Sequence, residues 1–295
     1  MTIDDLEAAM AQQVAALAKT NAELVAVLKS IKAGGDGGGG GTDPPLPPVL
    51  DLYKPMVPAR FAGMGEIWRL NGDERPALNG WDLFNGPPKQ NNEGGYFQPG
   101  NFVNRDGLLV LETRRQKMGT LDYTAAMMEN TNLRVGRGKP WFVSSLLGWD
   151  EYWGPWVGWW LYNLATQKEI DGVESVNKIG PTFNAHITQN GPQLGSKSTK
   201  PNATFDVGPL HHYGVGCDTT GLYTYVDGVE LMVNGPWWSA QFLNAQMWPK
   251  LQHSLLGWWP RDDAARKGVN IDFELAQTAL PNELRMAHFV ALEAS

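Results

Sequence analysis

The sequence predicts a mainly β protein: an antiparallel β-sandwich of the jelly-roll type, preceded by an N-terminal α-helical coiled coil. Three observations support this prediction. A heptad pattern of apolar residues is confined to residues 1–33. Short apolar runs separated by turn pairs such as Asn-Gly and Asp-Gly fill the chain after about residue 58. The 34 glycines, 20 prolines and 13 tryptophans suit short strands joined by turns, with aromatic rings left over for a binding surface.

Residues 1–33 are expected to form one helix, because they contain no glycine or proline and Thr2 can cap the start. Apolar positions recur every seven residues at Ile3, Met10, Leu17, Leu24 and Ile31. A single apolar stripe predicts self-association through this helix. By analogy with fibre and spike proteins, a trimer is favoured over a dimer. Docking of the helix on another protein is the alternative.

Residues 34–57 read as a linker, in which a glycine run is followed by a proline-rich stretch. The glycine half is expected to be flexible and the proline half stiffer. Such a tether suits a head that searches a surface, and display of several heads would strengthen weak binding. The head itself is expected over residues 58–295.

Composition excludes several classes of protein. The net charge of −7 and the lack of a Lys/Arg block argue against a nucleic-acid or anionic-membrane partner. No apolar run of about 18 residues predicts a membrane span, and the N-terminus lacks the pattern of a signal peptide. The single Cys217 excludes an intramolecular disulfide and is expected to be a buried thiol.

Strands account for the rest of the prediction. Several short strands are expected between residues 58 and 135, and two or three longer ones between 141 and 176. Further alternating runs lie at residues 182–188, 213–217, 222–226, 230–233 and 270–275. Together they predict about a dozen strands, with no helix after residue 33.

An acidic row in one of the longer strands is the main functional signal. Regular alternation would put Glu169 and Asp171 on one face and Glu174 on the other. A β-bulge around Gly172 and Val173 would return Glu174 to the face of the other two. Paired carboxylates about 5 Å apart are what a retaining glycosidase needs. A solvated acidic strand edge or a set of oxygen ligands for Ca²⁺ are the alternatives.

The stretch EIDGVE, residues 169–174, resembles the Glu-x-Asp-x-x-Glu signature of glycoside hydrolase family 16, the laminarinase and lichenase group. The similarity extends to NRDGLLVL at 104–111, YTAA at 123–126, WVGWWL at 156–161, LHHYGV at 210–215 and GLYTYVDGVE at 221–230. It covers roughly residues 60–290. The resemblance implies a concanavalin A-like jelly roll with Glu169 as nucleophile, Asp171 as its helper and Glu174 as acid/base. It implies no cofactor.

Two positions depart from that pattern, because Lys168 stands where the family usually has Gly and Cys217 where it has Trp. Alternation should point Lys168 away from the carboxylates.

Tryptophans supply the candidate sugar-binding residues, since sugar C–H faces stack on aromatic rings. We favour Trp153 and Trp156, in a loop before the acidic strand, and Trp238, in a loop after the Asp227-Gly228 turn. His186 and His211 are expected to be structural. No spacing of residues predicts a metal site, and a structural Ca²⁺ is the one ion left open.

Three functions fit these features: a polysaccharide hydrolase, an inactive carbohydrate-binding adhesin, and a purely structural spike. A glycan-directed head on a coiled-coil stalk, without a signal peptide, favours a bacteriophage tail or other virion protein. The expected partners are a host cell-surface polysaccharide and other virion proteins, and the expected location is the virion.

Overall fold

The computed structural model describes residues 54–89, 91–187, 193–194 and 205–295. They belong to a compact unit that spans Val49–Ser295. The predicted coiled coil of residues 1–33 and most of the predicted linker lie outside the described residues. The helix and its trimeric association therefore remain predictions.

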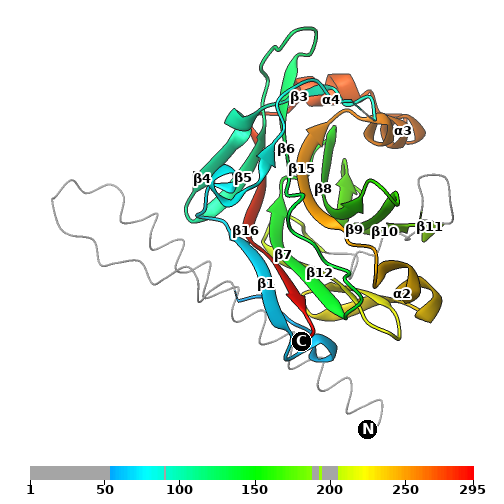
Figure 1. Ribbon diagram of the computed structural model, residues 1–295. Helices are drawn as coiled ribbons and strands as arrows, with labels where there is room; N and C mark the ends of the chain where they lie inside the picture. The colour runs from blue at the N-terminus through cyan, green and yellow to red at the C-terminus, as the bar shows by residue number, and fades with distance from the viewer. Residues whose placement is uncertain (1–53, 90, 188–192, 195–204) are drawn as a thin grey trace. The chain divides into compact units, whose positions relative to one another are not determined.

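The described residues form two sheets that pack face to face (Figure 1). Sheet A has the order β14-β13-β12-β7-β16-β5-β4, and β1 also pairs with β16. Its strands are β1 (Gly65–Asn71), β4 (Phe102–Arg105), β5 (Leu108–Thr113), β7 (Trp141–Trp149), β12 (His211–Cys217), β13 (Leu222–Val226), β14 (Val229–Asn234) and β16 (Asn282–Glu293).

Sheet B has the order β11-β10-β9-β8-β15-β6-β2, and β3 also pairs with β6. Its strands are β2 (Asp82–Leu83), β3 (Gly95–Phe97), β6 (Tyr123–Glu129), β8 (Pro155–Asn163), β9 (Lys168–Val176), β10 (Thr182–His186), β11 (Gln193–Leu194) and β15 (Trp248–Leu255). The pairings are antiparallel apart from β3 with β6. The predicted antiparallel sandwich is confirmed.

Turn pairs seen in the sequence fix two of the hairpins. Asp106 and Gly107, with φ of 53° and 78°, join β4 to β5. Asp227 and Gly228, with φ of 50° and 76°, join β13 to β14. Positive φ at both central residues matches the twist of the flanking strands, which explains the preference for Asp-Gly at these positions.

The main core lies between the sheets. Trp141 and Trp149 of sheet A, Trp159 and Phe183 of sheet B, and Phe289 of β16 are all fully buried there. A second cluster covers the outer face of sheet A, where Phe61 stacks on Phe142 with ring centroids 5.1 Å apart. All nine residues of β7 are buried, because β7 is covered on both faces.

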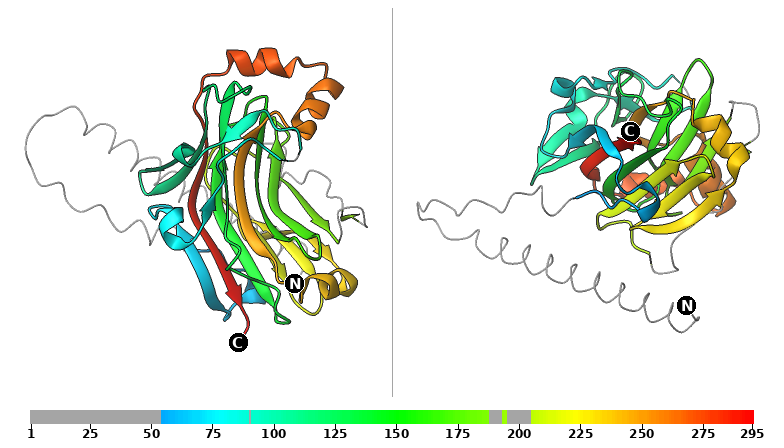
Figure 2. Two further views of the ribbon diagram at one scale, coloured as in Figure 1. Left: turned by 45° about the horizontal axis from the view of Figure 1, so that its top comes forward. Right: turned by 60° about the horizontal axis from the view of Figure 1, so that its bottom comes forward.

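The prediction of no helix after residue 33 is wrong. Helices α2 (Pro236–Phe242), α3 (Trp258–Arg266) and α4 (Ile271–Gln277) lie at the ends of the sandwich, α2 opposite α3 and α4 (Figures 1 and 2). Within the described residues, 3₁₀ turns add to them: η2 (Ala59–Phe61), η3 (Pro76–Asn79) and η4 (Pro99–Asn101). Residues 270–275, predicted as a strand, are the start of α4, whose cap Asn270 accepts a hydrogen bond from Phe273 N. Helices this short are stabilised by packing rather than by a long apolar period. No helix in the described ranges combines the length and apolarity that a membrane crossing requires.

The predicted bulge in β9 is confirmed. Against β8, Trp159 pairs with Val173 and Trp160 with Asp171, which leaves Gly172 as an extra residue. Ile170 and Val173 are three residues apart, yet both lie in the main core. Regular alternation would place them on opposite faces. The side chains of Glu169, Asp171 and Glu174 therefore share the face of β9 that points away from the core.

Glycine at position 172 is required by the Trp159 indole. A Cβ added to Gly172 would lie 1.9 Å from the Trp159 ring, which is fully buried between the sheets. The bulge and the core packing are thus one interlocked feature.

We expect Gly172→Ala to lower the free energy of unfolding by about 3 kcal/mol, because the methyl group must displace Trp159. Chemical denaturation measures this change. Gly100→Ala is the control, since its Cβ would meet nothing closer than Gln98 Oε1 at 4.0 Å. Equal losses for the two variants would contradict the interlocked bulge.

Candidate active site

Three carboxylates and two side chains of β10 gather on the outer face of sheet B, the face opposite the main core. The carboxylate oxygens of Glu169 and Asp171 and a ring nitrogen of His186 lie within 4.8 Å of one another. His186 Nε2 is 3.5 Å from Asp171 Oδ2. Asn184 Nδ2 donates a 3.0 Å hydrogen bond to Glu174 Oε2. The bulge thus brings the whole predicted acidic row to one site.

Glu174 is also held by β8. Trp156 Nε1 donates a 2.7 Å hydrogen bond to Glu174 Oε1. Gly158 pairs with Glu174 across the strands, and a Cβ there would lie 3.8 Å from Glu174 Cγ. Both oxygens of Glu174 therefore have a donor, and the neighbouring strand leaves room for its side chain.

Burial raises the pKa of all three carboxyl groups, and the charges near each group separate their protonation behaviour. It raises the pKa of Glu174 well above the usual range, the negative Asp171 adds to this, and the Trp156 donor opposes it. Burial and the charge of Glu169 raise the pKa of Asp171 well above its ordinary value. Burial also raises the pKa of Glu169, and the neighbouring His186 and Lys250 oppose part of this rise. Glu169 is therefore the best placed of the three to ionise, whereas Asp171 and Glu174 both favour their protonated forms.

Glu169, Asp171 and His186 are the one group of metal-ligating side chains found among the described residues. Ca²⁺ takes six to eight oxygen ligands, so a set containing imidazole suits a transition-metal ion better. A cation bound there would occupy the carboxylates that glycoside hydrolysis requires.

The three predicted sugar-binding tryptophans have different positions. Trp156 lies on β8 rather than in a loop and touches Glu174. Trp153 lies before β8 and packs against a cluster of apolar residues that includes Ala264 of α3 and Leu275 of α4. The Nζ atoms of Lys178 and Lys267 lie 5.8 and 5.5 Å from its ring centroid. Trp238 was expected in a loop but lies in α2, because Gly235 and Pro236 start a helix there.

Trp238 stacks on Phe242 and packs against the main core. The contacts found for it within the described ranges do not link it to the carboxylates. Lys168 also points away from them, since its Nζ donates to the carbonyl oxygen of Gln241 in α2.

Sequence reasoning missed Trp258 and Trp259 at the start of α3. Both rings meet Trp156 edge-to-face, with centroids 5.9 Å apart, and Trp258 is 49 % exposed. A Cβ at Gly257 would lie 2.6 Å from the Trp156 ring, so the glycine allows this close packing. Two tryptophans directly after a glycine at a strand end were the available signal. Asn184 gave no signal, because its role depends on the register of β10 against β9.

The outer face continues across β8, β15 and β6 as an aromatic and charged surface. Lys250 Nζ is 2.9 Å from Glu129 Oε2 and lies 5.3 and 5.9 Å from the ring centroids of Tyr162 and Trp160. Trp248 Nε1 donates to Glu129 Oε2 at 3.0 Å. Aromatic rings with fixed polar partners are the usual lining of a carbohydrate site.

The two packed antiparallel sheets define a jelly-roll sandwich. The sequence matches no protein-family model and no curated protein. Solved structures do match, among them the endo-β-1,3-glucanase from Pyrococcus furiosus, with 17 % identity over 78 % of this chain and 94 % of that chain and a TM-score of 0.64.

The catalytic domain of a laminarinase from Thermotoga petrophila RKU-1 matches with 20 % identity over 79 % of this chain and 98 % of that chain and a TM-score of 0.63. SCLam, a non-specific endo-β-1,3(4)-glucanase from family GH16, matches with 17 % identity over 82 % and 95 % and a TM-score of 0.61. The described chain therefore has the jelly-roll fold of family 16 endo-β-glucanases.

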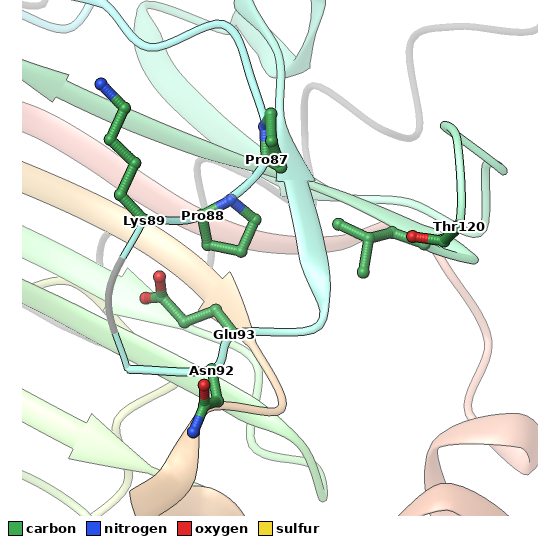
Figure 3. Close-up of a pocket in the computed structure, with 7 residues that line it drawn as sticks. Pro87, Pro88, Lys89, Asn92, Glu93 and Thr120 are labelled. Carbon is green, nitrogen blue, oxygen red and sulfur yellow. The ribbon is translucent and has the colours of Figure 1, made fainter.

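A cavity lies beside this face of sheet B, and Figure 3 shows its lining. It has a volume of about 400 Å³ and is lined by Pro87, Pro88, Lys89, Asn92, Glu93, Thr120 and Leu121. Glu93 is only 8 % exposed, and its Oε1 accepts a 2.9 Å hydrogen bond from Ser254 Oγ. Ser254 pairs with Trp156 across β15 and β8. Burial raises the pKa of Glu93 to about 7.

The pKa of Glu93 is about 7 in the folded state and 4.5 ordinarily, so the folded state disfavours the charged carboxylate. Glu93 therefore lowers the free energy of unfolding as the pH rises from 4.5 to about 7. Glu93→Gln keeps an acceptor for Ser254, and it should raise the free energy of unfolding by up to about 3 kcal/mol at pH 8 with little change at pH 4. Denaturation at both pH values measures the difference. Asp122→Asn, whose side chain is 72 % exposed, is the control. A pH-independent effect of Glu93→Gln would contradict the buried-acid assignment.

Proposed function

We propose that the head is a retaining endo-β-glycosidase that binds and cleaves a β-linked polysaccharide on the outer face of sheet B. The observation that carries this proposal is the convergence of Glu169, Asp171 and Glu174 on one face, with charges nearby that favour ionisation of Glu169. The family 16 fold supports it.

In this mechanism, the Glu169 carboxylate attacks the anomeric carbon while Glu174 gives its proton to the departing glycosidic oxygen. A covalent glycosyl-enzyme forms on Glu169. Glu174, now ionised, then takes a proton from water as the water displaces Glu169. Asp171 lies between them, and its raised pKa lets it share a proton with either partner.

Aromatic rings next to Glu174 would bind the sugar. Trp156 fixes the acid through its N–H group, while the exposed ring of Trp258 packs against Trp156 and offers a face for stacking. Leaving-group sugars are thereby held close to the proton donor.

A specific observation favours an inactive glycan-binding head as the second candidate. Both oxygens of Glu174 already accept hydrogen bonds, from Trp156 and Asn184. To act as an acid, Glu174 must exchange one of these donors for the glycosidic oxygen. A head in which this exchange fails would bind glycan without cleaving it.

We also propose that the chain is a virion-associated protein, of phage tail type, that contacts a host cell-surface polysaccharide. Support comes from the sequence: the heptad of residues 1–33, the glycine and proline tether, and the glycan-directed head. Trimerisation would let several weak glycan sites act together.

Substitution of each glutamate by glutamine tests the proposed hydrolysis. Glu169→Gln should abolish turnover while glycan affinity stays within a few-fold, because the amide keeps the shape but loses the nucleophile. Glu174→Gln should lower polysaccharide cleavage by about 10²- to 10⁴-fold and cost less on aryl glycosides, which need no proton. Reducing-sugar release and aryl-glycoside kinetics measure these effects.

Glu66→Gln, in β1 of sheet A, is the control. Equal losses for Glu169→Gln and Glu174→Gln on an aryl glycoside would contradict the assigned roles. Binding without cleavage by the wild type across β-glucans, galactans and host-wall preparations would favour the inactive binder.

Removal of residues 1–33 should leave a folded monomeric head, because the described sheets contain their own core. Sedimentation of the full chain should show a trimer and that of the truncated chain a monomer. An unchanged oligomer after truncation would mean that the head itself associates. It would contradict the prediction that residues 1–33 carry the association.

A further inference from the structure

Two arginines lie at the edge of the outer face of sheet B, in the segment between β6 and β7. Val135 in this segment is fully buried and exchanges two 3.0 Å backbone hydrogen bonds with Met247. Because the side chain of Val135 enters the core, its neighbour Arg134 projects to the other side. Gly136 follows with φ of 79°, where a Cβ would lie 2.7 Å from the Phe242 carbonyl oxygen. The backbone that carries Arg134 is therefore fixed.

Arg134 lies in line, across the strands of sheet B, with Glu169, the proposed nucleophile. Its guanidinium carbon lies over the Trp248 ring, 4.6 Å from the centroid. Trp248 pairs with Tyr162, and Tyr162 pairs with Glu169. Adjacent strands are about 4.8 Å apart, so Trp248 lies about 10 Å from β9 across the sheet. A polysaccharide crossing the strands at Glu169 would reach Trp248 and Arg134.

Positive charge is left uncompensated at this position. In the described ranges, neither Arg134 nor Arg137 has a carboxylate within 4.0 Å, whereas Lys250 nearby is paired with Glu129. The hydrogen bonds found for the two guanidinium groups go to main-chain oxygens. Arg134 donates to the carbonyl oxygen of Leu133, and Arg137 donates to the carbonyl oxygen of Arg134. Burial and the charge of Arg137 lower the pKa of Arg134. Two adjacent cations held apart from any carboxylate suit an anionic ligand.

We propose that Arg134 and Arg137 form an anion subsite, and that the polysaccharide bound by this head is acidic, carrying carboxylate or sulfate groups on its sugars. A planar guanidinium can bind such a group through two parallel N–H donors. The Trp248 ring under the Arg134 guanidinium holds this group in place and brings the anionic sugar to the aromatic face. This inference rests on the proposed glycan-binding function and names the class of its substrate.

Affinity electrophoresis of the full chain tests it. The gels contain neutral laminarin or lichenan, carboxylated alginate or hyaluronan, or sulfated chondroitin sulfate or λ-carrageenan. The wild type should be retarded more by an acidic glycan than by the neutral ones. Arg134→Gln should weaken retardation in the acidic gel by about ten-fold or more, as loss of charge-assisted hydrogen bonds predicts, and change the neutral gels less than two-fold.

Arg137→Gln alters an exposed residue and should lower retardation in the same gel by a smaller factor. It keeps the test open if Arg134→Gln does not fold. Arg266→Gln, an exposed residue of α3 at the other end of the sandwich, is the charge-matched control and should have no effect. Retardation by alginate or hyaluronan assigns the anion as a carboxylate, and retardation by the sulfated glycans assigns it as a sulfate.

Equal losses in neutral and acidic gels, stronger retardation by laminarin or lichenan, or no retardation in any gel would overturn the anion subsite. Glu169→Gln separates this result from the proposed hydrolysis. It should abolish cleavage while leaving retardation by the acidic glycan within a few-fold. A failed acidic preference with intact Glu169-dependent cleavage therefore rejects the subsite alone.

Discussion

The contact between Gly172 and the Trp159 indole is the constraint on which the site depends. The ring occupies the space where any other residue would place its Cβ. Gly172 is thereby left as the unpaired residue of a bulge, and the core residues Ile170 and Val173 both face inward. Three carboxylates are brought to the outer face of sheet B as a consequence. The fold and the proposed active site thus depend on the same packing contact.

Gathering those carboxylates opposes stability, since each is desolvated and two or more are close together. The neighbouring strands offset part of this cost through particular partners. Trp156 and Asn184 hydrogen-bond Glu174, while His186 and Lys250 favour the charged form of Glu169. The resulting difference between Glu169 and Glu174 is what a two-carboxylate mechanism uses.

Local sequence carried the information for the acidic strand, because a glycine inside an alternating run marks a bulge. The sandwich and its Asp-Gly hairpins were predictable for the same reason: alternation and turn chemistry are local. The role of Asn184 could not be found this way, since it depends on strand register. Gly257 followed by two tryptophans was a local signal for Trp258, but its contact with Trp156 depends on the packing of α3. Trp238 and residues 270–275 were misjudged because α2 and α4 are too short to show an apolar period.

Trapping of the covalent intermediate would show which carboxylate is the nucleophile. Incubation of the full chain with a 2-deoxy-2-fluoro β-oligosaccharide that bears a good leaving group, followed by proteolysis and mass spectrometry, locates the attached sugar. We expect a glycosyl ester on Glu169 alone, because the bulge brings Glu174 to the face of Glu169, where Glu169 can act as nucleophile and Glu174 as acid. Attachment to Glu174, Glu93 or a residue outside β9 would contradict it.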